Sequence, residues 1–217
     1  MLKPIRPHCD LCQRPQSACI CRWIRPLAPA VEVVILQHPL EVAQAKGSAR
    51  LLHLSLARSR LVAGETFAAD TLASLLFDAA GAAPAPALTV LLYPATPDAA
   101  SLSLPAPPLL DPAVPCDPAR LRLVVLDASW RKSRKMLYLN PLLQTLPRLP
   151  LSEPPPSRYR IRKAHAPDQL STLEATCHAL AQLEGDAAAY APLLCAFDGF
   201  VAQQAGYIPA AQETNRA

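Results

Sequence analysis

Apolar residues along the chain gather into three short runs, which longer amphipathic stretches separate. The runs at residues 31–36, 88–93 and 121–126 are rich in leucine and β-branched side chains, and each stops at a polar residue or a proline. Such runs are typical of strands that are buried on both faces of a sheet. Because helical segments separate them, the pattern favours an α/β fold with a mostly parallel sheet and flanking helices.

Four other stretches repeat their apolar residues with the period of a helix. Ser171 and Glu174 have the spacing of a capping box, in which two side chains satisfy backbone amides at a helix start. A helix that begins at Ser129 should end before Asn140-Pro141, because proline cannot continue it. In the last stretch, Asp198 falls on the outer face. We therefore predict helices over residues 48–61, 129–138, 171–183 and 190–204.

The length of 217 residues suits one main domain with a small appendage. We assign residues 26–217 to the main domain. No apolar run is long enough to cross a bilayer, and the N-terminus lacks the apolar core of a signal peptide. We therefore expect a cytoplasmic protein that does not enter a membrane, and the sequence leaves its oligomeric state open.

The appendage contains four cysteines spaced C-x2-C-x6-C-x-C. In a reducing compartment, four close thiols favour a metal over disulfides. Tetrahedral zinc fits thiolate ligands best, although the second pair is unusually tight. A redox C-x-x-C pair and unliganded cysteines are the alternatives. We predict a structural Zn²⁺ module over residues 1–25, with ligands Cys9, Cys12, Cys19 and Cys21.

The basic side chains are unevenly distributed, although the net charge is only +4. Residues 120–163 carry eleven Lys and Arg against Asp127 and Glu153, and residues 1–25 carry five against Asp10. Two basic segments on an acidic body indicate a polyanion-binding surface, provided that the fold brings them together. Chance segregation is the alternative.

Two clusters within the second basic segment favour nucleic acid as the polyanion. Four cations crowd one short helix at residues 131–135, with no acidic partner three or four positions away to offset their repulsion. Residues 157–163 alternate arginine with apolar residues, which places the arginines on one side of an extended chain. The expected contacts are Arg131, Lys132, Arg134, Lys135, Arg158, Arg160, Arg162 and Lys163.

The third apolar run stops at Asp127, and Ser129 and Trp130 follow at once. In open α/β sheets, ligands and catalytic groups gather at the carboxyl ends of strands, beside helix N-termini. The alternative is an ordinary helix cap before a solvated helix. Neither a G-x-G-x-x-G motif nor a P-loop is present, which argues against a dinucleotide site. A single carboxylate among cations suits an acid–base step on an anionic substrate.

Asp127-Ala128-Ser129-Trp130 resembles the D-x-T-W signature of the DTW-domain family, with Ser129 in place of the usual threonine. The resemblance extends over nearly the whole chain. Its other matches follow in order: the four cysteines, Gln37-His38-Pro39 with Glu41, Leu92-Tyr93-Pro94, residues 131–136, residues 157–163 and residues 171–175.

The resemblance implies a SPOUT-like knotted fold and a tRNA-uridine aminocarboxypropyltransferase. Such an enzyme moves the 3-amino-3-carboxypropyl group of S-adenosylmethionine to N3 of a uridine in tRNA. Asp127 would then remove the N3 proton or orient the base among the cations. Trp130 would stack on a base or on adenine, although a core position is equally compatible with the sequence. The implied cofactor-binding residues are Leu92, Tyr93, Pro94, Asp127, Ala128, Ser129, Trp130, Leu170, Ser171, Thr172 and Glu174.

Two other functions stay open at this point. A SPOUT-type RNA methyltransferase would share the fold and S-adenosylmethionine, and would differ only in the group that it transfers. A noncatalytic zinc-containing RNA-binding module would tolerate loss of Asp127 and would not bind S-adenosylmethionine.

Overall fold

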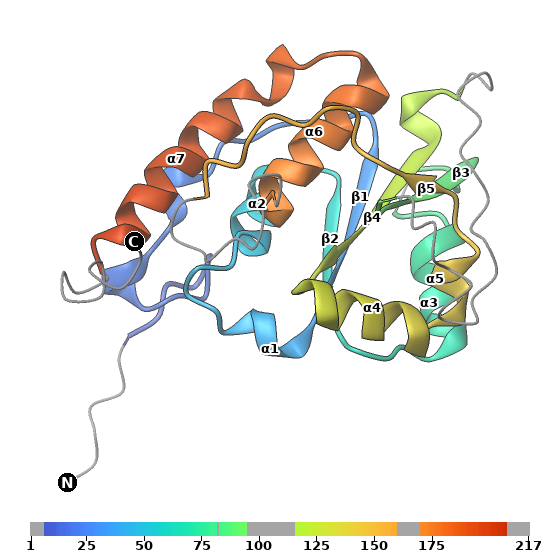
Figure 1. The fold of residues 1–217 in the computed structure, drawn as a ribbon, viewed down its shortest axis with the longest axis horizontal. Coiled ribbons are helices and arrows are strands. Elements are labelled where there is room, and N and C mark those ends of the chain that lie inside the picture. The colour runs from blue at the N-terminus through green and yellow to red at the C-terminus, as the bar shows by residue number, and fades with distance from the viewer. Residues whose placement is uncertain (1–6, 82, 95–115, 160–169, 208–217) are drawn as a thin grey trace, which may run out of the picture.

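The computed structural model describes residues 7–81, 83–94, 116–159 and 170–207. In this part of the chain five strands form one sheet in the order β2-β1-β4-β3-β5, and every neighbouring pair is parallel (Figure 1). The expected α/β class with a parallel sheet is therefore confirmed. The strands are β1 (Glu32–Gln37), β2 (Ser59–Ala63), β3 (Leu88–Leu92), β4 (Leu121–Asp127) and β5 (Arg148–Leu149).

Helices cover both faces of this sheet. The longest is α7 (Ala191–Ala205), and short 3-10 turns occupy Gln16–Ala18, Cys21–Trp23, Pro118–Arg120 and Ala188–Tyr190. No helix in the described ranges is long and apolar enough to cross a membrane. The remaining helices are α1 (Pro39–Val42), α2 (Ala49–Ser55), α3 (Ala69–Phe77), α4 (Trp130–Leu139), α5 (Pro141–Gln144) and α6 (Thr172–Glu184).

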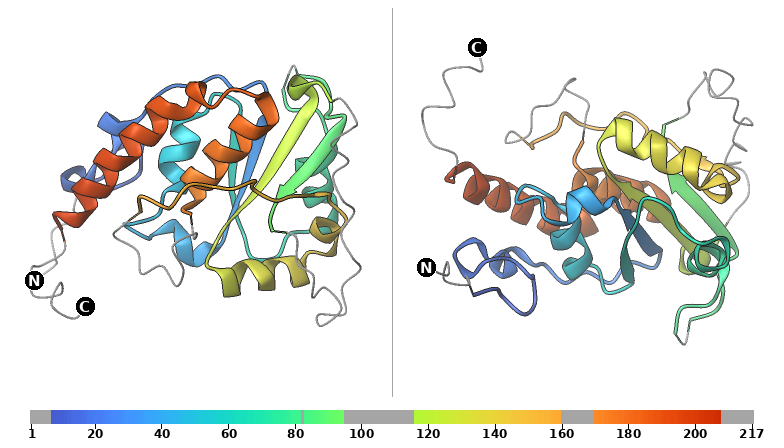
Figure 2. Two further views of the ribbon diagram at one scale, coloured as in Figure 1. Left: turned by 45° about the horizontal axis from the view of Figure 1, so that its top comes forward. Right: turned by 90° about the horizontal axis from the view of Figure 1, so that it is seen from below.

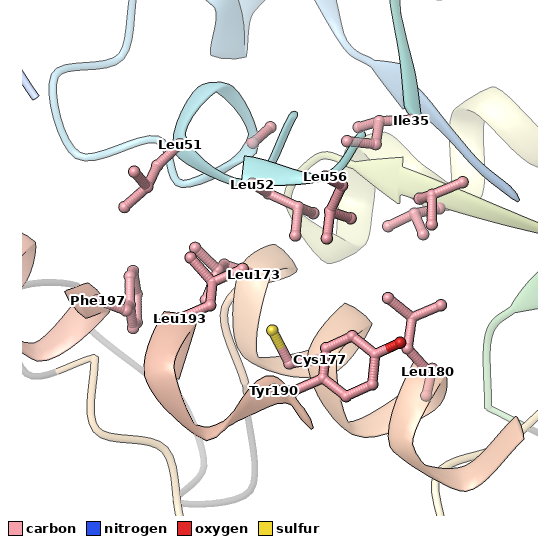
Figure 3. Close-up of a cluster of buried hydrophobic side chains, with 14 of the residues drawn as sticks. Ile35, Leu51, Leu52, Leu56, Leu173, Cys177, Leu180, Tyr190, Leu193 and Phe197 are labelled. Atoms are coloured by element: carbon pink, nitrogen blue, oxygen red, sulfur yellow. The ribbon is translucent and has the colours of Figure 1, made fainter. Parts of the chain in front are cut away.

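Alternate residues of the central strands enter two separate cores. On one face, Ile35 of β1 packs with α2, α6 and α7, and Figure 3 shows Leu52, Cys177 and Phe197 in this cluster. On the other face, Val34 packs with residues of α3, α4 and α5. Both faces of β1 and β4 are thus apolar, which explains why their sequences read as continuous hydrophobic runs.

The N-terminal segment packs against α7 and the first core. Cys12 and Ile20 belong to the same buried cluster as α6 and α7. The blue N-terminal segment lies beside the red helix α7 in both views of Figure 2. The assignment of residues 1–25 and 26–217 to separate domains stays a prediction.

The predicted helix over residues 48–61 is wrong in its second half. Helix α2 ends at Ser55, and β2 begins at Ser59 and pairs with β1. The hydroxyl of Ser59 donates to the carbonyl oxygens of His53 and Leu56, which gives the end of the helix a local partner. The helices predicted over residues 129–138, 171–183 and 190–204 are confirmed as α4, α6 and α7.

Candidate active site at the carboxyl edge of the sheet

Asp127 ends β4, next to Gln37 at the end of β1. The residue is 6% exposed. Gln37 Nε2 donates to Oδ2 at 2.8 Å, and the hydroxyl of Thr172, the first residue of α6, donates to Oδ1 at 2.6 Å. The carboxylate therefore joins the ends of two strands to the start of a helix.

This geometry argues against Asp127 as a simple helix cap. The N-cap position of α4 belongs to Ser129, whose side chain makes no capping hydrogen bond. The Asp127 carboxylate is instead held in orientation by two neutral donors. A carboxylate offers about four acceptor positions, and at least two of those of Asp127 accept hydrogen bonds from the protein.

Tyr93 and Trp130 form an aromatic pair at the same edge, on the side of α4. Their ring centroids lie 5.6 Å apart in an edge-to-face arrangement. Tyr93 is buried and its hydroxyl lies 3.3 Å from the Ser133 hydroxyl, whereas Trp130 is 49% exposed. The alternative of a buried core tryptophan is therefore wrong, because about half of this residue is accessible.

The capping box at the start of α6 is confirmed. Ser171 Oγ accepts from the amide of Glu174, and Glu174 Oε2 accepts from the amide of Ser171. The buried Glu174 carboxylate also accepts from the Ser157 hydroxyl and the Arg158 amide, at 3.0 and 2.7 Å. Glu174 thus holds Ser157 and Arg158, the first residues of the second basic cluster, in place. Leu170, before the cap, is partly buried.

Two of the four cations on α4 are paired by acidic residues of other elements. Lys132 Nζ donates to Glu41 at 2.8 Å, and Lys135 Nζ donates to Glu65 at 3.0 Å. The expectation that all four cations repel one another without compensation is therefore corrected, since only sequence neighbours had been considered. Arg131 and Arg134 are exposed, and no side-chain partner is seen for them in the described ranges.

A pocket of about 530 Å³ lies between α1 and the start of α4. His38 occupies its wall: its Nδ1 accepts from the Leu40 amide, so the proton of the neutral ring lies on Nε2, which donates to Glu65 at 3.0 Å. Hydrogen bonds from His38 and Lys135 lower the pKa of Glu65. The lining residues are His38, Pro39, Leu40, Glu65, Ser129, Arg131, Lys132 and Lys135.

The second basic cluster is only partly visible. The Arg158 guanidinium donates to Asp198 at 2.9 Å, so Asp198 is a half-exposed ion-pair partner of Arg158. Arg160, Arg162 and Lys163 lie outside the described residues. Whether the two basic clusters form one surface stays a prediction.

The four N-terminal cysteines converge as metal ligands would. Their Sγ atoms all lie within 4.8 Å of one another, with 3.6 Å between Cys9 and Cys21 and 3.8 Å between Cys12 and Cys19. A tetrahedral zinc with Zn–S bonds of about 2.3 Å has S–S edges of about 3.8 Å. Hydrogen bonds from the amides of Cys12 and Leu11 lower the pKa of the Cys9 thiol to about 7. The cluster can hold a metal ion of zinc's size and thiolate preference.

Four residues of this edge carried no individual role in the sequence prediction. Gln37 and His38 stood in a matched motif, but the motif does not indicate that one holds Asp127 and the other Glu65. No sequence pattern indicated a role for Glu65. Arg148 stacks on Tyr93 and had counted only toward the total basic charge.

A family model described as the DTW domain matches residues 6–205. The chain is 29% identical over 186 residues to tRNA-uridine aminocarboxypropyltransferase 2 of Mus musculus, covering 82% of this chain and 57% of that protein. It is 30% identical over 188 residues to the protein of the same name in Drosophila melanogaster, covering 82% and 67%. It is also 31% identical over 138 residues to tRNA-uridine aminocarboxypropyltransferase A of Arabidopsis thaliana, covering 61% and 50%. The chain thus spans little more than half the length of the mouse protein, and no solved structure matched it significantly.

Proposed function

The chain belongs to the DTW-domain family, and from this premise we propose that it transfers the 3-amino-3-carboxypropyl group of S-adenosylmethionine to N3 of a uridine in tRNA. The product is 3-(3-amino-3-carboxypropyl)uridine. The names of these relatives support the tRNA substrate and the transferred group. The observation that carries the proposal in this chain is the buried carboxylate of Asp127, held by Gln37 and Thr172.

In the proposed reaction, uridine N3 bonds to the terminal carbon of the aminocarboxypropyl arm while the bond from that carbon to sulfur breaks. The bonding electrons go to sulfur, which leaves neutral methylthioadenosine, and the N3 proton passes to Asp127. An ordinary aspartate is a weak base, with a pKa of about 3.9. The cations of α4 must therefore stabilise the developing uridine anion. The hydrogen bonds from Gln37 and Thr172 keep the carboxylate oriented toward N3 during the transfer.

In this proposal, S-adenosylmethionine and the tRNA contact different helices and strands around Asp127. We place S-adenosylmethionine across the ends of β3 and β4 and the start of α6, where Tyr93, Trp130 and Thr172 lie. Glu174 shapes that site by holding Ser157 and Arg158. The tRNA lies along α4, with a nucleotide in the pocket beside His38. Zinc in the cysteine cluster and a SPOUT-like knot belong to the same proposal.

The test is incubation of the purified protein with unmodified tRNA and S-adenosylmethionine labelled separately at the carboxyl carbon and at the methyl carbon. We expect the carboxyl label in tRNA, a uridine of matching added mass in the nucleoside digest, and an equal amount of methylthioadenosine. Transfer of the methyl label would instead make the protein a methyltransferase. Absence of both labels would leave a noncatalytic RNA-binding protein.

A further inference from the structure

Arg148 in the edge strand β5 is a buried cation, and no residue in the described ranges accepts a hydrogen bond from it. The residue is 5% exposed, and its Nε and Nη1 are enclosed without an acceptor among the described residues. The described ranges contain no hydrogen bond from Nη2 either. Burial lowers the pKa of this guanidinium. Unsatisfied donors of a buried charged group are costly, so their presence calls for an explanation.

A second buried arginine of the same sheet, by contrast, has hydrogen-bond acceptors within the protein. Arg122 in β4 is fully buried, and its Nε and Nη2 both donate to Glu32, at 3.0 and 2.7 Å. Its nitrogens also donate to the carbonyl oxygens of Leu75 and Asp78. The fold therefore supplies a carboxylate to this structural arginine, whereas the residues that the structure describes supply none to Arg148.

The position of Arg148 points to a ligand rather than to packing. Its Cζ lies 5.0 Å from the centroid of the Tyr93 ring. Tyr93 also makes the edge-to-face contact with Trp130, which follows Asp127 by three positions. Tyr93 thus contacts both the Arg148 cation of the edge strand and the Trp130 ring that follows the end of β4. Carboxylates are the preferred partners of guanidinium groups in such settings.

We propose that Arg148 holds the carboxylate of the aminocarboxypropyl arm of the donor, which makes it the residue that orients the transferred group. This inference rests on the proposed function. The carboxylate is the one negatively charged group of S-adenosylmethionine, whose ammonium and sulfonium groups are cations. An aminocarboxypropyl transferase must fix this arm, because the carbon that reacts belongs to it. A methyltransferase has no such requirement.

The burial of Arg148 favours a small carboxylate over a tRNA phosphate. A phosphodiester is flanked by riboses, and the exposed cations of α4 already offer such groups a more accessible partner. A terminal carboxylate on a flexible arm can reach the guanidinium of a residue that is 5% exposed.

The test compares binding of S-adenosylmethionine and of its decarboxylated analogue, which keeps the ammonium and the sulfonium, by calorimetry. The wild type should prefer the intact donor by about ten- to a hundredfold. Arg148→Met should lower the affinity for the intact donor to that of the analogue, and should change the affinity for the analogue by less than about twofold. Arg148→Lys should retain part of the preference, because it keeps the charge but loses the planar fork.

Other patterns would overturn the inference. It fails if Arg148→Met weakens both ligands equally, if the wild type binds both equally or neither, or if the variant loses tRNA affinity instead. It also fails if Arg148→Met lowers the melting temperature as much as Arg122→Met, since an unsatisfied arginine should be dispensable to the fold. A carboxylate-dependent affinity without any tRNA product would retain the role of Arg148 and reject the proposed reaction.

Discussion

The hydrogen bonds that Gln37 and Thr172 donate to the Asp127 carboxylate come from groups that can adapt to a change of partner. The Gln37 amide can turn over, and the Thr172 hydroxyl can rotate to accept instead of donate. Asp127→Asn should therefore fold normally and keep its affinity for S-adenosylmethionine within a few fold. We expect its turnover to fall by about 10²- to 10⁴-fold, the usual contribution of a positioned acid–base group. Single-turnover formation of modified uridine would measure this.

Thr172→Val is the matched control, because it removes one donor and keeps the carboxylate. Loss of a single hydrogen bond should slow turnover by about three- to tenfold. Wild-type turnover in Asp127→Asn, or a larger effect from Thr172→Val, would remove Asp127 from its proposed role.

Sequence pattern identified Asp127 but could not identify the residues around it. The end of an apolar run marks the end of a strand, so its position was predictable. The contact with Gln37 depends on the parallel register of β1 and β4, which are adjacent in the sheet but distant in the chain. The partners of Lys132 and Lys135 are equally nonlocal, and local spacing rules therefore missed them.

At the scale of elements, α4 presents two kinds of cation to a polyanion. Arg131 and Arg134 are exposed, whereas Lys132 and Lys135 already pair with glutamates. Replacing both arginines with glutamine should weaken tRNA binding and reduce the slope of log affinity against log salt by about two. Binding titrations at several salt concentrations would measure the slope. The same change at the two lysines is the control, and equal slope losses in both double variants would contradict this distinction.

Helix α7 carries a glycine that the N-terminal segment requires. A Cβ at Gly199 would overlap the ring of Trp23, whereas a Cβ at Gly206 would meet only ordinary contacts. Gly199→Ala should therefore destabilise the protein by about 1–3 kcal/mol through overpacking, although alanine ordinarily favours a helix. Gly206→Ala should be neutral or slightly stabilising. Chemical denaturation of both variants would measure this, and a stabilised Gly199→Ala would show that Trp23 does not need this site.

Sequence pattern misjudged the two edge strands of the sheet, β2 and β5. The sequence pattern predicts β2 as a continuation of α2, because the leucine of β2 fits the helical spacing. As an edge strand, β2 also lacks the long apolar run that marks a buried strand. Strand β5 has only two residues, too few for any periodicity. Long amphipathic helices such as α6 and α7 have enough repeats to be recognised, and their bounds differ little from those predicted.

At the scale of the whole molecule, the N-terminal cysteine segment packs against the main core. Cys12 and Ile20 are buried with α6 and α7, and Arg14 donates to the carbonyl oxygens of Ala45 and Gly47. Arg14 also lies over the ring of Phe200. Loss of the proposed zinc should therefore loosen helix α7 and the chain around Gly47 as well as the cysteine loops.

We expect about one zinc per chain in the purified protein, and a large loss of stability when a chelator removes it. Metal binding and folding of such a segment are coupled, because four thiolates cannot stay close together without a cation. Cys12→Ser should bind little zinc and melt more than about 10 °C below the wild type, which corresponds to several kcal/mol for a chain of this size. Cys195→Ser, an exposed cysteine outside the cluster, is the control and should change neither property. Zinc-free protein that melts at the wild-type temperature would mean that the cysteine loops hold their place by packing alone.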